Sequence, residues 1–153
     1  MTRWLSESEQ ASWRAWIEAS NTLNHRLSVD LQRQHDITLA DYEILVQLSE
    51  HPERRMRMSE LAEATLASRS RLTHQVDRLA KRGFVERQEC ELDKRGAFAA
   101  LTDAGWTAIE QAAPDHVASV RAYLVDLLSA KEFAALGAAC ERISRNLAEH
   151  PDA

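Results

Sequence analysis

Basic and polar side chains gather in one short stretch of the chain, SRSRLTHQV from Ser68 to Val76. Arginine, serine, threonine, histidine and glutamine can all hydrogen-bond to base edges or phosphates when a helix enters the major groove of DNA. Leu72, Val76 and Leu79 recur at helical spacing, so they form one narrow stripe and leave the polar residues on the opposite face. The candidate DNA-contacting residues on this helix are Ser68, Arg69, Ser70, Arg71, Thr73, His74, Gln75 and Arg78. The alternative is a solvated helix face, which the context disfavours because a tight turn precedes the stretch and a hairpin follows it.

A second charged group, Asp93-Lys94-Arg95, stands before Gly96 at the expected tip of this β-hairpin. Arg95 can enter a minor groove, where narrow A·T-rich DNA concentrates negative potential, and Lys94 suits a phosphate. A carboxylate is poorly suited to face DNA, so we expect Asp93 to orient Arg95 or another arginine of the hairpin through a charge-assisted hydrogen bond. The alternative is an ordinary polar turn in which Gly96 supplies a positive φ.

The charge of the chain is divided between its middle and its ends. The sequence has 153 residues and a formal net charge of −5, which alone argues weakly against a nucleic-acid partner. Residues 54–95, however, hold 11 of the 19 Lys and Arg residues but only 7 of the 24 Asp and Glu residues. The basic middle and the acidic ends predict a nucleic-acid-facing centre carried on a frame that does not bind DNA.

The sequence carries no pattern typical of an enzyme or a metal site. It lacks a glycine-rich phosphate loop, Gly-x-Ser-x-Gly and His-Glu-x-x-His, and its histidines are scattered without metal-ligand spacing. We therefore expect no catalytic residue, no metal and no cofactor. Cys90 and Cys140 are too few for a disulfide framework and are interpreted as two reduced thiols. No signal peptide is evident and no apolar run approaches the roughly 18 residues of a membrane helix, which predicts a cytoplasmic protein with no membrane partner.

The elements expected around these residues are mainly helices that begin at capping signals. The expected helices run from Ser6 to about Gln34, from Thr38 to His51, from Glu60 to about Ala64, from Ser68 or Ser70 to Gly83, from Thr102 to Leu127 and from Ser129 onward. Ser59 is expected to cap the third helix, and the stretch before it, 53–58, to be a charged connection. Pro114 lies inside the fifth helix, where it removes an amide donor and predicts a kink. Phe84–Glu89 and Ala97–Leu101 are the expected strands of the hairpin.

A short helix, a tight turn and a second helix, followed by a hairpin, make a winged helix-turn-helix. From Leu39 to Gly105 the chain resembles the MarR family of bacterial transcription regulators. The matching residues are SELAEATLASRSRLTHQVDRLAKRGFVER from Ser59 to Arg87, Asp93-x-Arg95 in the wing, and Leu101-Thr102-x-x-Gly105 after it. The resemblance implies a mainly α (α+β) fold, in which a winged helix-turn-helix domain lies between flanking N- and C-terminal dimerisation helices.

The function that the resemblance implies is that of a DNA-binding transcriptional regulator. Members of the family are usually homodimeric repressors that bind pseudo-palindromic operators and are released by a small ligand. The corresponding segments of this chain are 6–37 for the N-terminal dimerisation helix, 38–105 for the DNA-binding lobe and 106–150 for the C-terminal dimerisation helices. The expected partners are double-stranded DNA and a second copy of the chain.

Aromatic residues of the first two helices are candidates for a ligand site. The resemblance implies a crevice between the DNA-binding lobe and the dimerisation helices that receives aromatic acids or similar effectors. Trp16, Tyr42, Glu43 and His116 are the residues expected to line it. The alternative is that the aromatic residues pack the dimer core. Two other functions stay open: a redox-responsive regulator acting through Cys90, and a protein-interaction module that has lost DNA binding.

Overall fold

The structure is a computed structural model that describes residues 1–90 and 93–149, with the backbone alone for residues 90 and 93–95. The described elements are α1 (Glu7–His35), α2 (Leu39–Glu50), β1 (Arg55–Arg57), α3 (Met58–Ala64), α4 (Arg69–Lys81), β2 (Val85–Cys90), β3 (Asp93–Leu101), α5 (Asp103–Tyr123), the 3-10 helix η1 (Val125–Leu127) and α6 (Ala130–Glu149). Helices dominate and the sheet is small, which confirms the predicted mainly α class. The chain divides into two compact units, Met1–His116 and Val117–Ala153.

The first two helices begin at the capping residues expected from the sequence. The Ser6 hydroxyl accepts a hydrogen bond from the Glu9 amide at 3.3 Å, and the Glu9 carboxylate accepts one from the Ser6 amide at 2.7 Å. Thr38 and Asp41 repeat this arrangement at the start of α2. Such reciprocal bonds satisfy amides that would have no partner in the first helical turn. The bonds from Ser6 also hold the pKa of the Glu9 carboxyl below its usual value.

Strand β1 is an element that the sequence analysis missed. The expected connection 53–58 contains Arg55–Arg57, which pairs antiparallel with β3 and sets Arg57 opposite Phe98. A three-residue strand with two arginines has no alternating apolar pattern, and its pairing partner lies far away in the sequence. Local patterns therefore could not indicate it.

The start of α3 differs from the expectation as well. The helix begins at Met58 and its N-cap residue is Arg57, not Ser59. The Glu60 carboxylate accepts a hydrogen bond from the Arg57 amide at 3.2 Å, so the carboxylate supplies the capping interaction. Because β1 ends directly at this point, the backbone enters the helix two residues earlier than the serine suggests.

The hairpin is longer on its second strand than the sequence predicts. The sheet has the order β1-β3-β2, and β2 pairs with β3 from Val85 opposite Leu101 to Cys90 opposite Asp93. Asp93–Gly96 was expected to form the turn but belongs to β3. The two joining residues, 91 and 92, lie outside the described part of the chain. Cross-strand pairing thus prevails over the turn preference of a charged, glycine-containing stretch.

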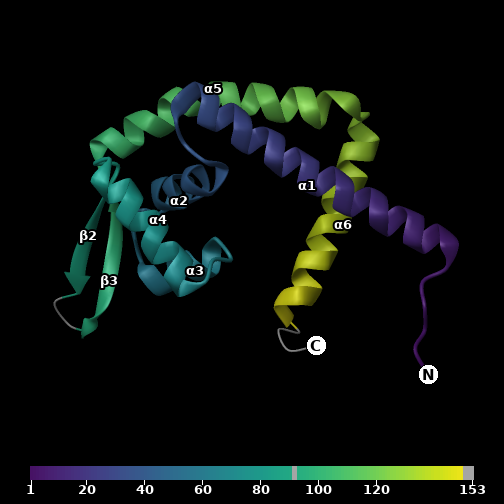
Figure 1. Cartoon of the computed structure of the whole chain (residues 1–153), viewed down its shortest axis with the longest axis horizontal. Helices are drawn as coiled ribbons and strands as arrows, with labels where there is room; N and C mark the ends of the chain where they lie inside the picture. The colour runs from purple at the N-terminus through teal and green to yellow at the C-terminus, as the bar shows by residue number, and fades with distance from the viewer. Residues whose placement is uncertain (91–92, 150–153) are drawn as a thin grey trace. The chain divides into compact units, whose positions relative to one another are not determined.

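The hydrophobic core lies in the first unit and joins α2, α3, α4 and the sheet. Its most deeply buried side chains are Leu31, Ile37, Ile44, Leu45, Leu48, Leu61, Leu72, Val76, Leu79 and Val85. Burying each such side chain stabilises the fold by about 1.5–3 kcal/mol relative to leaving it in water. Figure 1 shows α2, α3 and α4 gathered beside the hairpin of β2 and β3. This core holds α4 at a fixed depth against its neighbours.

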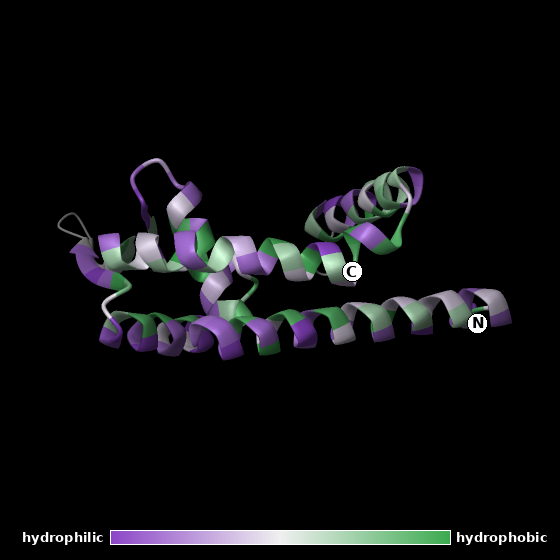
Figure 2. Ribbon diagram, turned by 90° about the horizontal axis from the view of Figure 1, so that it is seen from above, coloured by the Kyte–Doolittle hydropathy of each residue, from purple (hydrophilic) through white to green (hydrophobic). Residues whose placement is uncertain are grey.

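The last two helices are amphipathic and follow the sequence expectation except at one end. The helix α5 stops at Tyr123 rather than Leu127, because Leu124 leaves the helical conformation and residues 125–127 form η1. Pro114 lies within the continuous helix, and the kink stays a prediction. Figure 2 shows hydrophobic and hydrophilic residues alternating around the helices. None of the helices in the described ranges is long and apolar enough to cross a membrane.

Candidate nucleic-acid interface

Helix α4 presents much of the predicted polar face. The Ser68 hydroxyl accepts a hydrogen bond from the Arg71 amide at 3.2 Å, which fixes the first turn of the helix as predicted. Leu72, Val76 and Leu79 face the core and are almost completely buried. The exposed candidates are Ser68, Arg69, Ser70, Arg71 and His74, while Thr73 is half-buried. Basic and hydroxyl side chains therefore crowd the first two turns of α4, where they are free to meet DNA.

Two of the residues expected on this face lie elsewhere. Gln75 is only 8% exposed, because its position on α4 is turned toward the core. The Arg78 guanidinium reaches the start of α2, where Nη2 donates to Asp41 Oδ1 at 2.5 Å. The sequence predicts that the whole polar side of α4 is one exposed face. The burial of Gln75 and the contact of Arg78 with Asp41 of α2 make the exposed part of this face narrower. Lys81 remains exposed at the end of α4 and was not singled out by the sequence.

Three arginines surround a groove between α4 and the wing. A hollow of about 360 Å³ is lined by Arg57, Met58, Ser59, Arg69, Leu72, Thr73, Arg87, Gly96 and Ala97. Arg87 is held in place by Asp77 of α4, with the Nη1–Oδ1 distance at 2.8 Å. The sequence indicated Arg69 only. Arg57 was missed because β1 was missed, and Arg87 because it was seen only as part of the family motif.

The turn between α3 and α4 is tight. The Ala67 amide donates to the Ala62 carbonyl at 2.9 Å, which closes the turn. Leu66 has a φ of 51° and is 94% exposed. A bulky residue with positive φ costs about 1–3 kcal/mol of backbone strain. The core residues on both sides of the turn hold it in this conformation.

The motif Leu101-Thr102-x-x-Gly105 ties the base of the wing to α5. The Thr102 hydroxyl donates to the Gly83 carbonyl at 2.6 Å and accepts from the Gly105 amide at 3.0 Å. A side chain at Gly105 would meet the Phe84 carbonyl oxygen at 2.1 Å. Threonine and glycine are thus required here by the close approach of α5 to the start of β2.

The charged residues of the wing have only part of their geometry described. Asp93, Lys94 and Arg95 lie in β3, but their side chains are outside the described atoms. The predicted roles of these three residues therefore stay predictions. Closer to α5, the Arg54 guanidinium stacks over the Trp106 ring at 4.0 Å from its centroid. Such stacking holds an arginine against the base of the wing.

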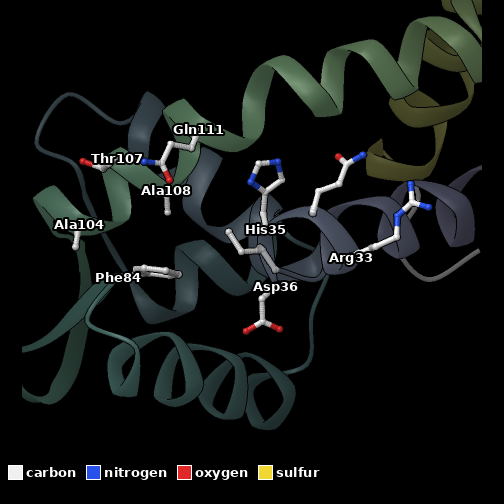
Figure 3. Close-up of a pocket in the computed structure, with 10 residues that line it drawn as sticks. Arg33, His35, Asp36, Phe84, Ala104, Thr107, Ala108 and Gln111 are labelled. Atoms are coloured by element: carbon white, nitrogen blue, oxygen red, sulfur yellow. The ribbon is translucent and has the colours of Figure 1, made fainter.

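Arg82, directly after α4, links this helix to the corner between α1 and α2. Its guanidinium donates to the Asp36 carbonyl and stacks over the Phe84 ring at 4.7 Å. Beside this link is a hollow of about 560 Å³, lined by Arg33, Gln34, His35, Asp36, Ile37, Phe84, Ala104, Thr107, Ala108 and Gln111. Figure 3 shows Phe84 on one side of it and His35 on another. His35 Nε2 lies 2.9 Å from Asp115 Oδ2, which ties α1 to α5.

Two of the four predicted ligand-pocket residues come together. The rings of Tyr42 and His116 lie 4.7 Å apart, and burial raises the pKa of the Tyr42 hydroxyl and lowers that of the His116 imidazole. The His116 Nδ1 atom is buried without a hydrogen-bond partner. Trp16 lies on the exposed N-terminal half of α1, and Glu43 is exposed beside Ala40 and Arg71.

Cysteines and possible metal ligands are described for part of the chain. Cys140 is a free, half-buried thiol on α6, and the side chain of Cys90 lies outside the described atoms. Within the ranges 1–90 and 93–149, no three His, Cys, Asp or Glu side chains are grouped so that they could hold a metal ion.

Known proteins share this arrangement of helices and wing. A model of the MarR family matches residues 35–96, from the end of α1 into the wing. AbsC, a MarR family transcriptional regulator from Streptomyces coelicolor, is 46% identical and has a TM-score of 0.89, with 97% of this chain and 99% of that chain covered. The chain belongs to the MarR family.

As a MarR family protein, the chain is a transcriptional regulator and not an enzyme. Sco3205, another MarR family regulator from Streptomyces coelicolor, was crystallised in complex with DNA. It is 42% identical with a TM-score of 0.92, and 96% of this chain and 92% of that chain are covered. The transcriptional repressor YetL of Bacillus subtilis is 31% identical over 83 residues, 54% of this chain and 50% of YetL. The predicted winged helix-turn-helix is confirmed, and α4 is its recognition helix.

Proposed function

We propose that this MarR family regulator binds a pseudo-palindromic operator as a homodimer, with one α4 in each of two successive major grooves. The observation that carries the proposal is the polar and basic surface formed by the first turns of α4 and the adjacent groove. Arg69 and Arg71 start the recognition helix in an exposed position, and Arg57 lines the same groove as Arg69. Two-fold related helices about one DNA turn apart require a site of matching symmetry. The complex of Sco3205 with DNA, a protein 42% identical to this chain, supports DNA binding.

The wing supplies the second group of proposed contacts. Lys94 and Arg95 lie near the hairpin end of β3, which suits Lys94 for a phosphate and Arg95 for the minor groove at the edge of the site. Asp93 is proposed to orient Arg95. Proteins of this kind combine phosphate contacts, which give affinity, with base contacts from the helix, which give sequence preference.

Exposed apolar side chains support the homodimer. Trp13 and Trp16 on α1 are 55% and 44% exposed, and Phe133, Ile143 and Leu147 of α6 are exposed as well. Apolar side chains that recur along a helix face at this exposure are typical of surfaces that pair with another chain. A second copy of this chain would remove these side chains from water and set the two recognition helices in one complex.

The regulator is proposed to repress transcription until a small aromatic effector releases it from DNA. YetL, a relative, is a repressor by name, and this supports repression. The buried Tyr42 and His116 form a tilted ring pair in which the buried ring nitrogen Nδ1 of His116 has no hydrogen-bond partner, so an acid or phenol that opens this pair could hydrogen-bond to that nitrogen. The roles of Trp16 and Glu43 in effector binding stay predictions. The effector must bind the released state better than the DNA-bound state, by about 1–3 kcal/mol for a 5–150-fold effect.

DNA binding is tested by selecting duplexes from a random-sequence pool with the wild-type chain, followed by gel-shift titration of the enriched duplex. We expect an enriched inverted repeat. Arg71→Ala should weaken binding by about 1–3 kcal/mol per contact if the arginine reads a base. Lys131→Ala, which removes one positive charge from the second unit, is the control and should bind as the wild type does. A wild-type chain that enriches no sequence would contradict the proposal.

The effector site is tested separately. Phenolic and aromatic acids are titrated while tryptophan fluorescence and binding to the selected duplex are followed together. Release from DNA should be lost in Tyr42→Ala. Ligands that change the fluorescence without weakening DNA binding, or a Tyr42→Ala variant that responds like the wild type, would show that the site is wrong.

A further inference from the structure

The ion pair between Arg78 and Asp41 joins the recognition helix to the start of α2. The Asp41 side chain is 3% exposed, whereas that of Arg78 is 52% exposed, and Nη2 approaches Oδ1 to 2.5 Å. A carboxylate withdrawn from water to this degree needs a charged or hydrogen-bonding partner. The guanidinium of Arg78 therefore supplies the buried Asp41 carboxylate with a charged partner, although about half of the arginine side chain stays exposed.

Asp41 is itself fixed on two sides. Its Oδ2 atom accepts a hydrogen bond from the Thr38 amide at 3.4 Å, and its own amide donates to the Thr38 hydroxyl at 3.1 Å. The next residue, Tyr42, packs on His116 of α5. The carboxylate thus sits on a part of α2 that cannot move alone, and it forms a rigid anchor for Arg78.

The two sides of α4 are held by different forces. Leu72, Val76 and Leu79 bury one side in the core and set the depth of the helix. Apolar contacts have little directional preference, so they restrict rotation of the helix about its axis less than a directed hydrogen bond does. Gln75, one turn before Arg78, is buried on the same side as this ion pair. Base readout needs side chains placed to within about 0.5 Å and 10–20°.

We propose that Arg78 is a positioning residue: its bond to Asp41 sets the orientation of α4 for base readout, and its guanidinium makes no contact with the DNA. This inference rests on the proposed DNA-binding function and replaces the sequence prediction that Arg78 contacts DNA. It makes the start of α2 part of the machinery that presents the recognition helix.

The test compares Arg78→Gln and Asp41→Asn with the wild type on two probes, the selected duplex and an unrelated duplex of equal length, over a range of salt concentrations. Asp41→Asn removes one negative charge from the chain, so a purely electrostatic effect would strengthen DNA binding. We expect the opposite. Both variants should bind the selected duplex about 5- to 30-fold more weakly, the factor that corresponds to one or two kcal/mol. Their binding to the unrelated duplex and their salt dependence should not change.

Three controls separate positioning from contact and from folding. We assign the exposed Arg69 to a phosphate contact, so Arg69→Ala should lower the slope of log K against log salt by about 0.9 per contact. Thr38→Ala removes the hydroxyl that caps α2 but keeps the backbone amide that donates to Asp41 Oδ2 and the Arg78–Asp41 pair, so its preference for the selected duplex should persist. The double variant of Arg78→Gln with Asp41→Asn should bind no more weakly than either single variant. All titrations are run below the onset of thermal unfolding, followed by circular dichroism.

Several results would overturn the inference. In one such result, Arg78→Gln lowers the slope of log K against log salt by about 0.9 per contact while Asp41→Asn binds DNA as the wild type does. This pattern is expected if Arg78 contacts a phosphate. Unchanged DNA binding in both Arg78→Gln and Asp41→Asn would also overturn the inference. So would a loss of preference for the selected duplex in Thr38→Ala that equals the loss in these two variants. A wild-type chain that enriches no duplex would instead reject the proposed function, and the inference with it.

Discussion

At the scale of single residues, Gly105 occupies a position with no room for a side chain. A β-carbon there would lie 2.1 Å from the Phe84 carbonyl oxygen and 2.7 Å from Leu101 Cδ1. Because the backbone carbonyl cannot swing aside, Gly105→Ala should lower the free energy of unfolding by about 1–3 kcal/mol. Gly137→Ala on α6 is the matched control: nothing lies within 4 Å of the added carbon, and stability should stay or rise by up to about 1 kcal/mol. Urea unfolding measures both, and equal stability of the two variants would contradict the packing at the wing base.

His116 makes the stability of the first unit depend on pH. Burial lowers the pKa of its imidazole, so the folded chain disfavours the charged form. The unfolded chain takes up a proton near the ordinary pKa of about 6.5, and the folded chain only at lower pH. Below about pH 6.5 the unfolded state binds more protons, so stability falls as the pH drops toward the folded pKa.

We predict that His116→Phe loses less stability on acidification than the wild type. Phenylalanine keeps a ring against Tyr42 and cannot be charged. Thermal unfolding is measured at about pH 7.5 and about pH 5.5, on either side of the ordinary histidine pKa of about 6.5. His25→Gln, at an exposed position of α1, should behave like the wild type. An acid sensitivity of His116→Phe equal to that of the wild type would assign the effect to other groups.

At the scale of the elements, the structure distinguishes a true helix cap from an apparent one. Ser68 caps α4 through its hydroxyl, whereas α3 is capped through Glu60 and the Arg57 backbone. Ser68→Ala should therefore cost about 1 kcal/mol of stability. Ser59→Ala should cost much less, although the sequence suggested both serines as N-cap residues, because Ser59 lies inside α3. Denaturant unfolding of both variants checks this, and the reverse order of stability would contradict the assigned caps.

The elements that the sequence predicted correctly are those specified by neighbours in the chain. Capping boxes such as Ser6–Glu9 and the stripe of Leu72, Val76 and Leu79 act within two turns, so they can be read locally. Strand β1 and the true length of β3 depend on pairing between distant segments, and both were missed. A family motif located the wing but not the Gly96 conformation, because the glycine lies inside a strand.

The candidate site shows the same division. The exposed residues at the start of α4 followed from helical spacing and were predicted. Gln75 and Arg78 were expected on that face, but Gln75 is buried, and Arg78, although half exposed, is held in an ion pair with Asp41 of α2. Arg57 lines the groove because it lies in β1, a strand that the sequence did not predict. The spacing of residues in the sequence predicts on which side of its helix a side chain lies. Tertiary packing determines which other residues this side chain contacts.

At the scale of the whole molecule, one copy of the chain offers a single recognition helix and a single wing. Half-sites read by one helix give limited specificity, and two linked copies combine their contacts on one stretch of DNA. Exposed apolar residues lie on α1 and on α6, among them Trp13 and Ile143, and we propose that they contact the second copy. We therefore propose that the first unit reads the DNA sequence and that pairing of two copies makes this reading specific.

A hydroxyl-radical footprint of the wild-type chain on its selected duplex tests this claim most directly. We predict two protected backbone segments on one face of the DNA, related by two-fold symmetry and centred about 10 base pairs apart, as two successive major grooves require. Weaker protection should extend into the flanking minor grooves, where the wings carrying Arg95 would lie. A single protected segment without symmetry, or uniform cleavage along the duplex at saturating protein, would contradict the account.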